Sequence, residues 1–442
     1  MRATLRLLAP CGLLALTSAA APSCSVYDAS LKEPFPRESG AAGAAGATGD
    51  GWGKGWWSKQ GDNKCFSAGV PTGKDRPAPS AKPDRPPFFV AITKLRLGSQ
   101  NVDGSDNGDA WKDIGFDLDG YCTSSPTCGI DFDNAGCDQG TIPARIDGND
   151  CRDNNFGRFE VFVAQTPEVG AKYRLNDTQF NCGLCAGYYN FLIRVTGYNG
   201  EPDDDELRLD VYPSIGTETT TGIDCSTATT PSTLCWLSND PFVLDESGFG
   251  APAADGGLPD AKVFDAHAYV RNGYVVANLP DDSSFWFPTE PSDGVNTFPI
   301  KIQKAVITGR IEKGQDGTVV VKDGLIAGRV RKDDVIGGFR ALGLCENEGQ
   351  LYKTMVNYVS SNLDVLADGT NSPMAPCDAL SVGVGFEAKE ATRSETTGHA
   401  TPLTECVNAF AGAGGAGGSA GGAGASGAGA GGASAGSAGA GG

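Results

Sequence analysis

Histidine and basic side chains are scarce in this chain of 442 residues. It has only two histidines, His267 and His399, so most histidine-dependent metal sites and acid–base schemes lack material. Lysine and arginine number 35 against 54 aspartates and glutamates, which gives a formal net charge of −19. Because nucleic-acid binding needs clustered basic side chains that displace counterions from phosphates, we do not expect nucleic acid as a partner.

Long apolar segments are also lacking. Beyond the N-terminal segment, no stretch approaches the roughly eighteen uninterrupted apolar residues of a membrane-spanning helix. Residues 1–23 have the pattern of an export signal, with Arg2 and Arg6, then an apolar stretch over residues 7–16, then small residues. We therefore predict a signal peptide over residues 1–23 and no transmembrane helix after it.

The segment Ala21-Pro-Ser-Cys24 resembles the lipidation motif of bacterial lipoproteins, in which the cysteine becomes the N-terminus. Removing Cys11 with the signal and Cys24 by lipidation leaves twelve of fourteen cysteines, an even number that could form six disulfides in an oxidising compartment. These features predict an exported protein, held by lipid at the outer membrane or cell surface. The alternative is cleavage near residues 18–20, which leaves Cys24 structural or unpaired.

Both ends of the chain are of low complexity. Residues 24–87 are rich in glycine and proline, which predicts a spacer with little structure of its own. Trp52, Trp56 and Trp57 are exceptions, and we expect them to dock on the folded domain, with a polysaccharide as the alternative partner. Residues 411–442 contain only glycine, alanine and serine, which predicts a disordered tail.

Strand patterns dominate residues 88–410, which we predict to be one disulfide-braced domain or two sub-domains. Apolar alternation and β-branched runs indicate strands at the following positions: 88–97, 189–196, 206–212, 300–311, 318–321, 325–330 and 377–388. Asn272-Gly273 favours a tight hairpin turn within residues 268–277. Helical spacing of apolar residues predicts a helix over 350–366, with a shorter one over 333–342. The expected fold is mainly β, an antiparallel β-sandwich or jelly roll with a small helical insertion near the C-terminal end.

Aspartate without glutamate characterises residues 100–155, which contain twelve aspartates. The residues Asp103, Ser105, Asn107 and Asp109 follow the spacing of a calcium loop, but Ile114 replaces its final glutamate, which excludes a complete EF-hand. Asp117 and Asp119 are further candidate ligands, as are Asp147 and Asn149. Calcium is the candidate cofactor, and the alternative is that these side chains cap turns and keep the surface soluble.

The pair Cys182-Gly-Leu-Cys185 has the spacing of a redox or zinc motif. We expect structural disulfides instead, because a strand is predicted directly after it and no second such motif exists to complete a zinc site. Spacing does not fix the partners, but four local pairs suggest themselves: Cys122 with Cys128, Cys137 with Cys151, Cys225 with Cys235, and Cys345 with Cys377.

No catalytic signature is present. The chain has no nucleophile elbow, no zinc-protease motif and no phosphate loop, and His267 lies on an alternating strand where a solvated face residue is expected. One alternative function is a secreted polysaccharide hydrolase that uses paired carboxylates in a cleft lined by Trp111, Trp236 or Trp286. Another is a thiol redox protein using Cys182 and Cys185.

Four segments resemble a loose group of exported lipoproteins found in myxobacteria, for which no activity is established. They are Asp113-Ile-Gly-Phe-Asp-Leu-Asp-Gly-Tyr-Cys122, Arg194-Val-Thr-Gly-Tyr-Asn-Gly200, Asp323-Gly-Leu-Ile-Ala-Gly-Arg329 and Cys377-Asp-Ala-Leu-Ser-Val-Gly-Val-Gly-Phe-Glu387. The resemblance implies a location in the cell envelope. Together with the residue patterns it predicts an anchored extracytoplasmic protein with a binding or structural domain, whose partners are the anchoring membrane and an extracellular glycan or protein.

Overall fold

A computed structural model describes residues 55–60, 66–123, 136–139, 146–165, 177–219, 223, 225, 235–253, 257–289, 296–314, 317–341, 344–346 and 349–402. The predicted signal peptide, Cys24, Trp52 and the C-terminal tail lie outside these residues. In the part of the chain that is described, no helix has both the length and the apolar character needed to cross a bilayer.

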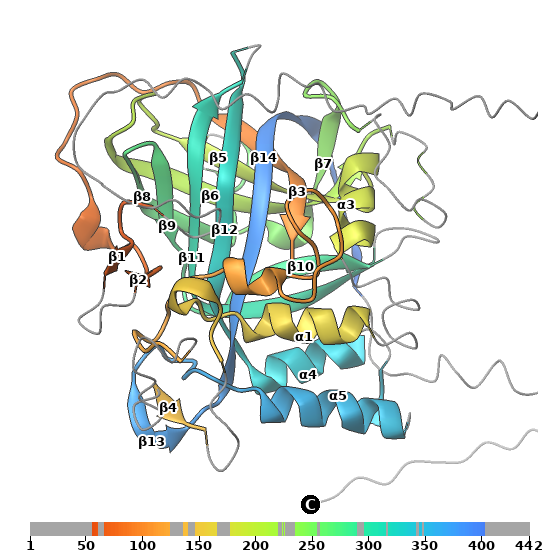
Figure 1. Cartoon of the computed structure of the whole chain (residues 1–442). Helices are drawn as coiled ribbons and strands as arrows, with labels where there is room; N and C mark the ends of the chain where they lie inside the picture. Colours follow the sequence, from red (N-terminus) through yellow and green to blue (C-terminus); the bar gives the residue numbers. More distant parts are fainter. Residues whose placement is uncertain are drawn as a thin grey trace, which may run out of the picture.

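Eight antiparallel strands form a closed barrel (Figure 1). In order around the barrel they are β11 (Asn296–Lys313), β12 (Val319–Arg331), β14 (Ala379–Gly398), β3 (Phe88–Arg96), β5 (Asn190–Thr196), β6 (Asp204–Thr217), β8 (Val263–Arg271) and β9 (Tyr274–Asn278). The ring closes because β9 pairs with β11, from Val306 opposite Asn278 to Arg310 opposite Tyr274. The expectation of a β-sandwich or jelly roll is therefore wrong, although the fold is mainly β.

Large aliphatic and aromatic side chains from all eight strands fill the barrel interior. Neighbouring residues of a strand point to opposite faces, so Val90 and Ile92 of β3 belong to this core, whereas Ala91 belongs to a cluster on the outside. A barrel of eight strands has an interior just wide enough to be filled in this way. The hairpin of β8 and β9 turns at Asn272 and Gly273, which have φ of 50° and 80°, as the sequence predicts.

Among the described residues, four α-helices lie outside the barrel, and three of them lie together below the strands in Figure 1. These three are α1 (Asn155–Ala164), α4 (Lys332–Ala341) and α5 (Gln350–Ser361); the fourth, α3 (Asp177–Ala186), contacts β3. The sequence predicts α4 and α5 but not α1 or α3. The interior cluster continues into the helices through side chains such as Phe159, Phe339 and Val359.

Short strands extend the sheet at its margins. β10 (Ser283–Thr289) pairs with the first part of β11, β7 (Pro241–Asp245) joins β14 and β6, and β15 (Thr401–Pro402) pairs with β11. Two separate ribbons consist of β1 (Lys59–Gln60) with β2 (Phe66–Ser67), and of β4 (Cys137–Asp138) with β13 (Ser372–Pro376).

Part of the predicted spacer packs on the barrel instead of standing free. Trp57 is buried against Phe116 and Tyr274, so docking of this aromatic on the domain is confirmed. Further along, the Tyr269 hydroxyl donates to the Thr72 carbonyl at 2.7 Å, and the Arg85 amide donates to the Tyr198 carbonyl at 2.7 Å. Parts of the predicted spacer between residues 66 and 85 therefore contact the folded domain.

Disulfides join segments that are far apart in the sequence. The described bonds are Cys122–Cys151, Cys137–Cys377, Cys182–Cys225 and Cys185–Cys235. Cys345 is also disulfide-bonded, and Cys128 lies outside the described residues. All four local pairs suggested by spacing are thus incorrect, because Cys122, Cys137, Cys225 and Cys377 each bond a more distant cysteine. The four bonds agree with an exported protein, since disulfides persist in oxidising compartments.

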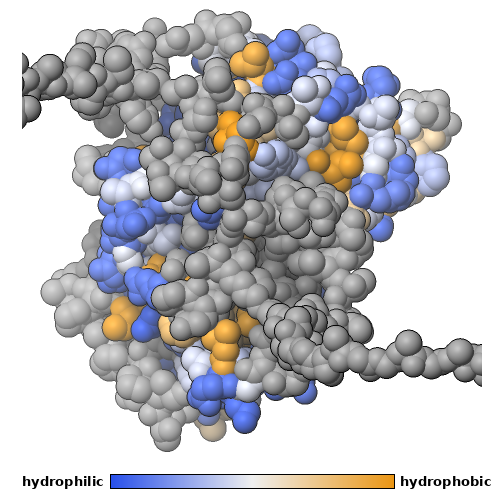
Figure 2. Space-filling model, turned by 90° about the vertical axis from the view of Figure 1, so that its right-hand side faces the viewer, coloured by the Kyte–Doolittle hydropathy of each residue, from blue (hydrophilic) through white to orange (hydrophobic). Residues whose placement is uncertain are grey.

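One face of the molecule carries apolar residues in small groups between hydrophilic ones (Figure 2). Large apolar side chains that are well exposed in the described part of the chain are Val102, Ile146, Leu237 and Met374. They come from separate loops and margins, so they define no single apolar contact surface.

Candidate functional site

Two loops, residues 114–123 and 146–155, lie against the outer face of β12 and β14. The amide of Gly383 in β14 donates to the Asn154 side-chain oxygen at 2.9 Å, and the guanidinium of Arg329 in β12 donates to the Leu118 carbonyl at 2.8 Å. The Asn155 amide donates to the Ser381 hydroxyl at 2.9 Å. Both loops are therefore held by the rigid barrel wall.

Glycines allow the first loop to approach the barrel closely. A Cβ atom added at Gly383 would lie 2.9 Å from the Gly115 Cα and 3.0 Å from the Ile114 carbonyl oxygen. Gly115 itself has a φ of 134°, which side-chain-bearing residues rarely adopt. In β14, Leu380, Val382 and Val384 point into the barrel, and the residues between them are small and point outward. The loop can therefore pack closely against the outer face of this strand.

The two loops are joined to each other. The backbone of Phe116 pairs with that of Asp153, and the disulfide between Cys122 and Cys151 links the loops a second time. Asp150 and Cys151 have φ of 55° and 58°, a conformation that non-glycine residues adopt at an energetic cost. The surrounding structure thus holds this turn in a strained shape.

Three carboxylates meet where the loops join. Asp117, Asp119 and Asp153 each offer one oxygen atom, and these atoms all lie within 4.8 Å of one another. Backbone amides orient the side chains: the Gly120 amide donates to Asp117 at 2.7 Å, and the Leu118 amide donates to Asp153 at 2.6 Å. Asp117 and Asp153 are buried, and Asp119 is half-buried.

A fourth carboxylate, that of Asp147, acts on the same group. The Thr123 amide donates to it at 2.6 Å. Burial raises the pKa of Asp147 well above its ordinary value, and the charges of Asp119 and Asp117 raise it further. Burial likewise raises the pKa of Asp153 well above its ordinary value, with the neighbouring carboxylates adding to the effect. Four carboxylates thus repel one another where solvent screens them poorly.

The positive charge that acts on this group comes from Arg329. Arg329, only 6% exposed, acts on Asp119 and Asp153, and burial is the main cause that lowers its pKa. The single charge of Arg329 is smaller than the combined charge of Asp119 and Asp153 when both are ionised. A bound cation would offset the difference.

The carboxylate spacing suits a hard divalent cation. Calcium binds six to eight oxygen ligands at about 2.4 Å, so two oxygens on one ion can be up to about 4.8 Å apart. The separations among Asp117, Asp119 and Asp153 do not exceed this limit. Carboxylates, backbone carbonyls and water are the ligands that calcium prefers, whereas zinc favours nitrogen and sulfur.

The loop predicted from EF-hand spacing has a different arrangement. The Ser105 hydroxyl donates to Asp103 at 2.6 Å, the Asn107 amide group donates to Asn101 at 2.7 Å, and Asp109 pairs with Lys112 at 2.7 Å. The bond from Ser105 is the main cause that lowers the pKa of Asp103. In the described structure these four residues do not join Asp117 and Asp119, and they form the turn-capping contacts of the alternative interpretation.

The sequence patterns missed Asp153. They identified Asp147 and Asn149 in the same acidic segment, Ile-Asp-Gly-Asn-Asp-Cys-Arg-Asp, but gave no reason to extend the ligand set by four residues. Asn149 is exposed, and its side-chain amide group donates to Asp113 at 2.8 Å. A useful signal would have been the pairing of Cys122 with Cys151, which brings Asp153 beside Asp119.

The features expected of a hydrolase or a redox protein are dispersed. Trp111 is buried against Gly98, and Trp236 is buried against Phe242 in an outer cluster. Trp286 lies in β10, and its side chain is outside the described residues. Cys182 and Cys185 lie on α3 and bond different partners. His267 is exposed, and its ring contacts Glu206 at 2.8 Å.

Comparisons with known proteins give no relative from which a role could be transferred. Neither the protein-family models, nor the curated proteins, nor the solved structures contain a match to this chain.

Proposed function

We propose that this chain is an extracytoplasmic binding or structural protein of the cell envelope, lipid-anchored through Cys24, whose outer loops are ordered by calcium. The ligands on the protein are Asp117, Asp119 and Asp153, with Asp147 contributing charge and a further oxygen. The anchor attaches the protein to the outer membrane or cell surface, and the partner there is an extracellular glycan or protein.

The observation that supports calcium best is the meeting of three carboxylate oxygens within 4.8 Å in a largely buried setting. Buried charges are costly unless they are paired or coordinate a metal. A divalent cation bound between these side chains would attract each of them and offset their mutual repulsion. It would also hold together the two loops that Cys122 and Cys151 already join.

The compartment supports the same proposal. The four described disulfides fit an oxidising environment, and the calcium sites of extracellular modules commonly have dissociation constants of about 0.1–1 mM. A site of this modest affinity would be filled outside the cell and largely empty in the cytosol. The resemblance to exported lipoproteins favours the same location.

Thermal melts with calcium and with a chelator test the cation. We expect about 1 mM calcium to raise the midpoint of the wild type by several degrees, because binding to the folded state alone stabilises it. Asp153→Asn should abolish most of that rise. Asp103→Asn, on the solvated loop, is the matched control and should keep the full rise. Equal midpoints for the wild type in calcium and chelator would refute the calcium site.

The anchor is tested separately. A native mass spectrum of the protein purified from membranes should show a lipid mass on Cys24, and Cys24→Ala should release the protein from the membrane fraction. An unmodified N-terminus cleaved near residues 18–20 would refute the anchor and leave the calcium site untouched.

A further inference from the structure

A second candidate site is a cavity of about 210 Å³ beside the barrel core, bordered by β5, β6, β8 and β10. Its floor consists of Phe191, Val211, Val263 and Phe285, all of which are buried and belong to the interior cluster. The rings of Phe191 and Phe285 meet edge to face with centroids 6.3 Å apart. An apolar cavity of about 150 Å³ is already large enough to bind benzene, so this one can hold a substituted six-membered ring.

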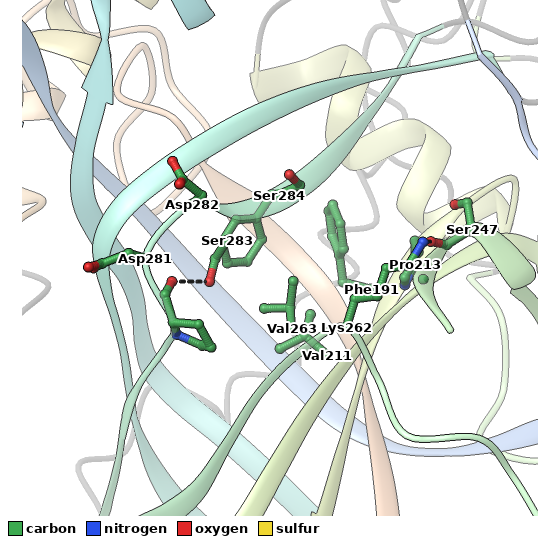
Figure 3. Close-up of a pocket in the computed structure, with 13 residues that line it drawn as sticks. Phe191, Val211, Pro213, Ser247, Lys262, Val263, Asp281, Asp282, Ser283 and Ser284 are labelled. Carbon is green, nitrogen blue, oxygen red and sulfur yellow. Dashed lines mark hydrogen bonds between the residues drawn. The ribbon is translucent and has the colours of Figure 1, made fainter. Parts of the chain in front are cut away.

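The polar groups of the cavity lie at its edges. Figure 3 shows Ser247, Pro213 and Lys262 on one side of the pocket and Asp281 and Asp282 on the other. This separation gives the cavity two chemically different ends with an apolar floor between them.

The serine end has donors to offer. The Ser247 hydroxyl is buried and has no hydrogen-bond partner among the residues that the structure describes. A buried hydroxyl without a partner is costly, so a ligand atom that bonds it would be favoured. The Lys262 ammonium donates to the Ser247 carbonyl at 2.8 Å, which uses one of its three hydrogens. A ligand oxygen here could accept bonds from both residues.

The acidic end is occupied by contacts within the protein. Asp281 pairs with Lys304 at 2.9 Å, and Asp282 accepts a bond from the Gln303 side chain. Lys304 offsets the charge of Asp281, and the Gln303 side chain bonds one oxygen of Asp282. The selective end of the cavity is therefore the one with Ser247 and Lys262.

We infer that this cavity binds a small aromatic monocarboxylate. Its ring lies on the apolar floor that Phe191, Phe285 and the two valines form together, and its carboxylate accepts bonds from the Ser247 hydroxyl and the Lys262 ammonium. A charge-assisted bond from an ammonium is among the stronger polar contacts and orients the ligand in one direction. The site is separate from the carboxylate group of the calcium proposal.

Calorimetric titration of the full folded protein with benzoate tests the inference, with toluene and acetate as probes that lack the carboxylate and the ring. We expect saturable binding of benzoate in the millimolar range and at least about tenfold weaker binding of either partial probe. Lys262→Met should weaken benzoate about tenfold, and Ser247→Ala a few-fold. Lys353→Met, an exposed lysine on α5, is the control and should bind as the wild type does.

A measurement on the unmutated protein removes any dependence on how variants fold. With methyl-labelled valine, benzoate should shift the resonances of Val211 and Val263 and leave those of Val359 in α5 unchanged. Absence of saturable benzoate binding, or binding that shifts neither valine and is unaffected by Lys262→Met, would overturn the inference. Binding of toluene as tight as that of benzoate would likewise overturn the carboxylate assignment.

Discussion

The barrel and the acidic loops on its outer wall are stabilised by different physical means. In the barrel, backbone pairing closes a ring and aliphatic side chains such as Ile307 and Val384 exclude water from its interior. In the loops, short carboxylates, a disulfide and close glycine contacts replace regular structure. The barrel can therefore tolerate changes of ionic conditions that should alter the loops, and function that depends on a cation is expected in the loops.

The largest expected effect comes from the barrel. Phe386 of β14 is 1% exposed and packs over Gly324, so Phe386→Ala leaves a large cavity and should cost about 3–5 kcal/mol of unfolding free energy. Denaturant unfolding with calcium and with chelator should give the same loss. Met374→Ala, at a position 89% exposed, should cost almost nothing. A loss for Phe386→Ala that appears only in calcium would remove the distinction between the two regions.

The disulfide between the loops comes next. Cys122 and Cys151 are separated by 29 residues, and opening a loop of that size should cost about 3–4 kcal/mol by the chain-entropy model. Replacing both with serine should also weaken the proposed calcium binding, because the two loops that carry the carboxylates are then joined less firmly. The double serine variant of Cys185 and Cys235 is the control: it should lose stability but keep the wild-type calcium affinity in a titration.

Close packing between the regions is tested at Gly383. A methyl group there would meet the backbone of Gly115 at 2.9 Å. Gly383→Ala should therefore cost about 1–3 kcal/mol of unfolding free energy, and the same change should weaken the proposed calcium binding. Gly337→Ala, at a helical glycine with no neighbour near the added methyl, serves as the control. Wild-type calcium affinity in a stable Gly383→Ala protein would mean that the loop does not depend on this contact.

The smallest effect concerns pH and lies outside both regions. Glu160 on α1 is 5% exposed. Burial raises its pKa well above the ordinary value, and the charge of Asp177 raises it further. Because the folded state holds this proton more tightly, stability from this group is full below about pH 4.5 and falls as pH rises through the folded pKa. Glu160→Gln should therefore be the more stable protein at pH 8, by about 1 kcal/mol, with little difference at pH 4.

Melting curves across that pH range provide the check for Glu160. The midpoint difference between Glu160→Gln and the wild type should grow steadily with pH. A difference that stays constant, or that shrinks toward pH 8, would contradict the burial of an ionised carboxylate at this position.

Local patterns in the sequence predicted the local parts of the fold. The Asn272-Gly273 turn depends on residues next to it, and α5 follows from apolar spacing within one segment. Barrel closure could not be predicted in this way, because a closed ring and a sandwich need the same alternation and differ only in whether β9 pairs with β11. α1 was missed because its phenylalanines and valines favour strands as well.

The candidate site was predictable to a similar degree. Asp117 and Asp119 are candidates from the sequence because they follow the Asp103 loop closely in the same aspartate-rich segment. Asp153 needed knowledge of a contact with a second loop, and the disulfide that makes this contact could not be assigned from spacing alone. The loop around Asp103 had the better local pattern, yet its polar side chains bond each other and nearby residues.

Hydrogen–deuterium exchange of the wild type in calcium and in chelator tests the central claim most directly, because it reports both regions in one experiment. Calcium should slow exchange in residues 114–123 and 146–155, while the amides of β5, β11 and β12 should exchange equally slowly in both conditions. Loops that exchange at the same rate with and without calcium, or protection spread evenly over the barrel strands, would contradict a cation site confined to the outer loops.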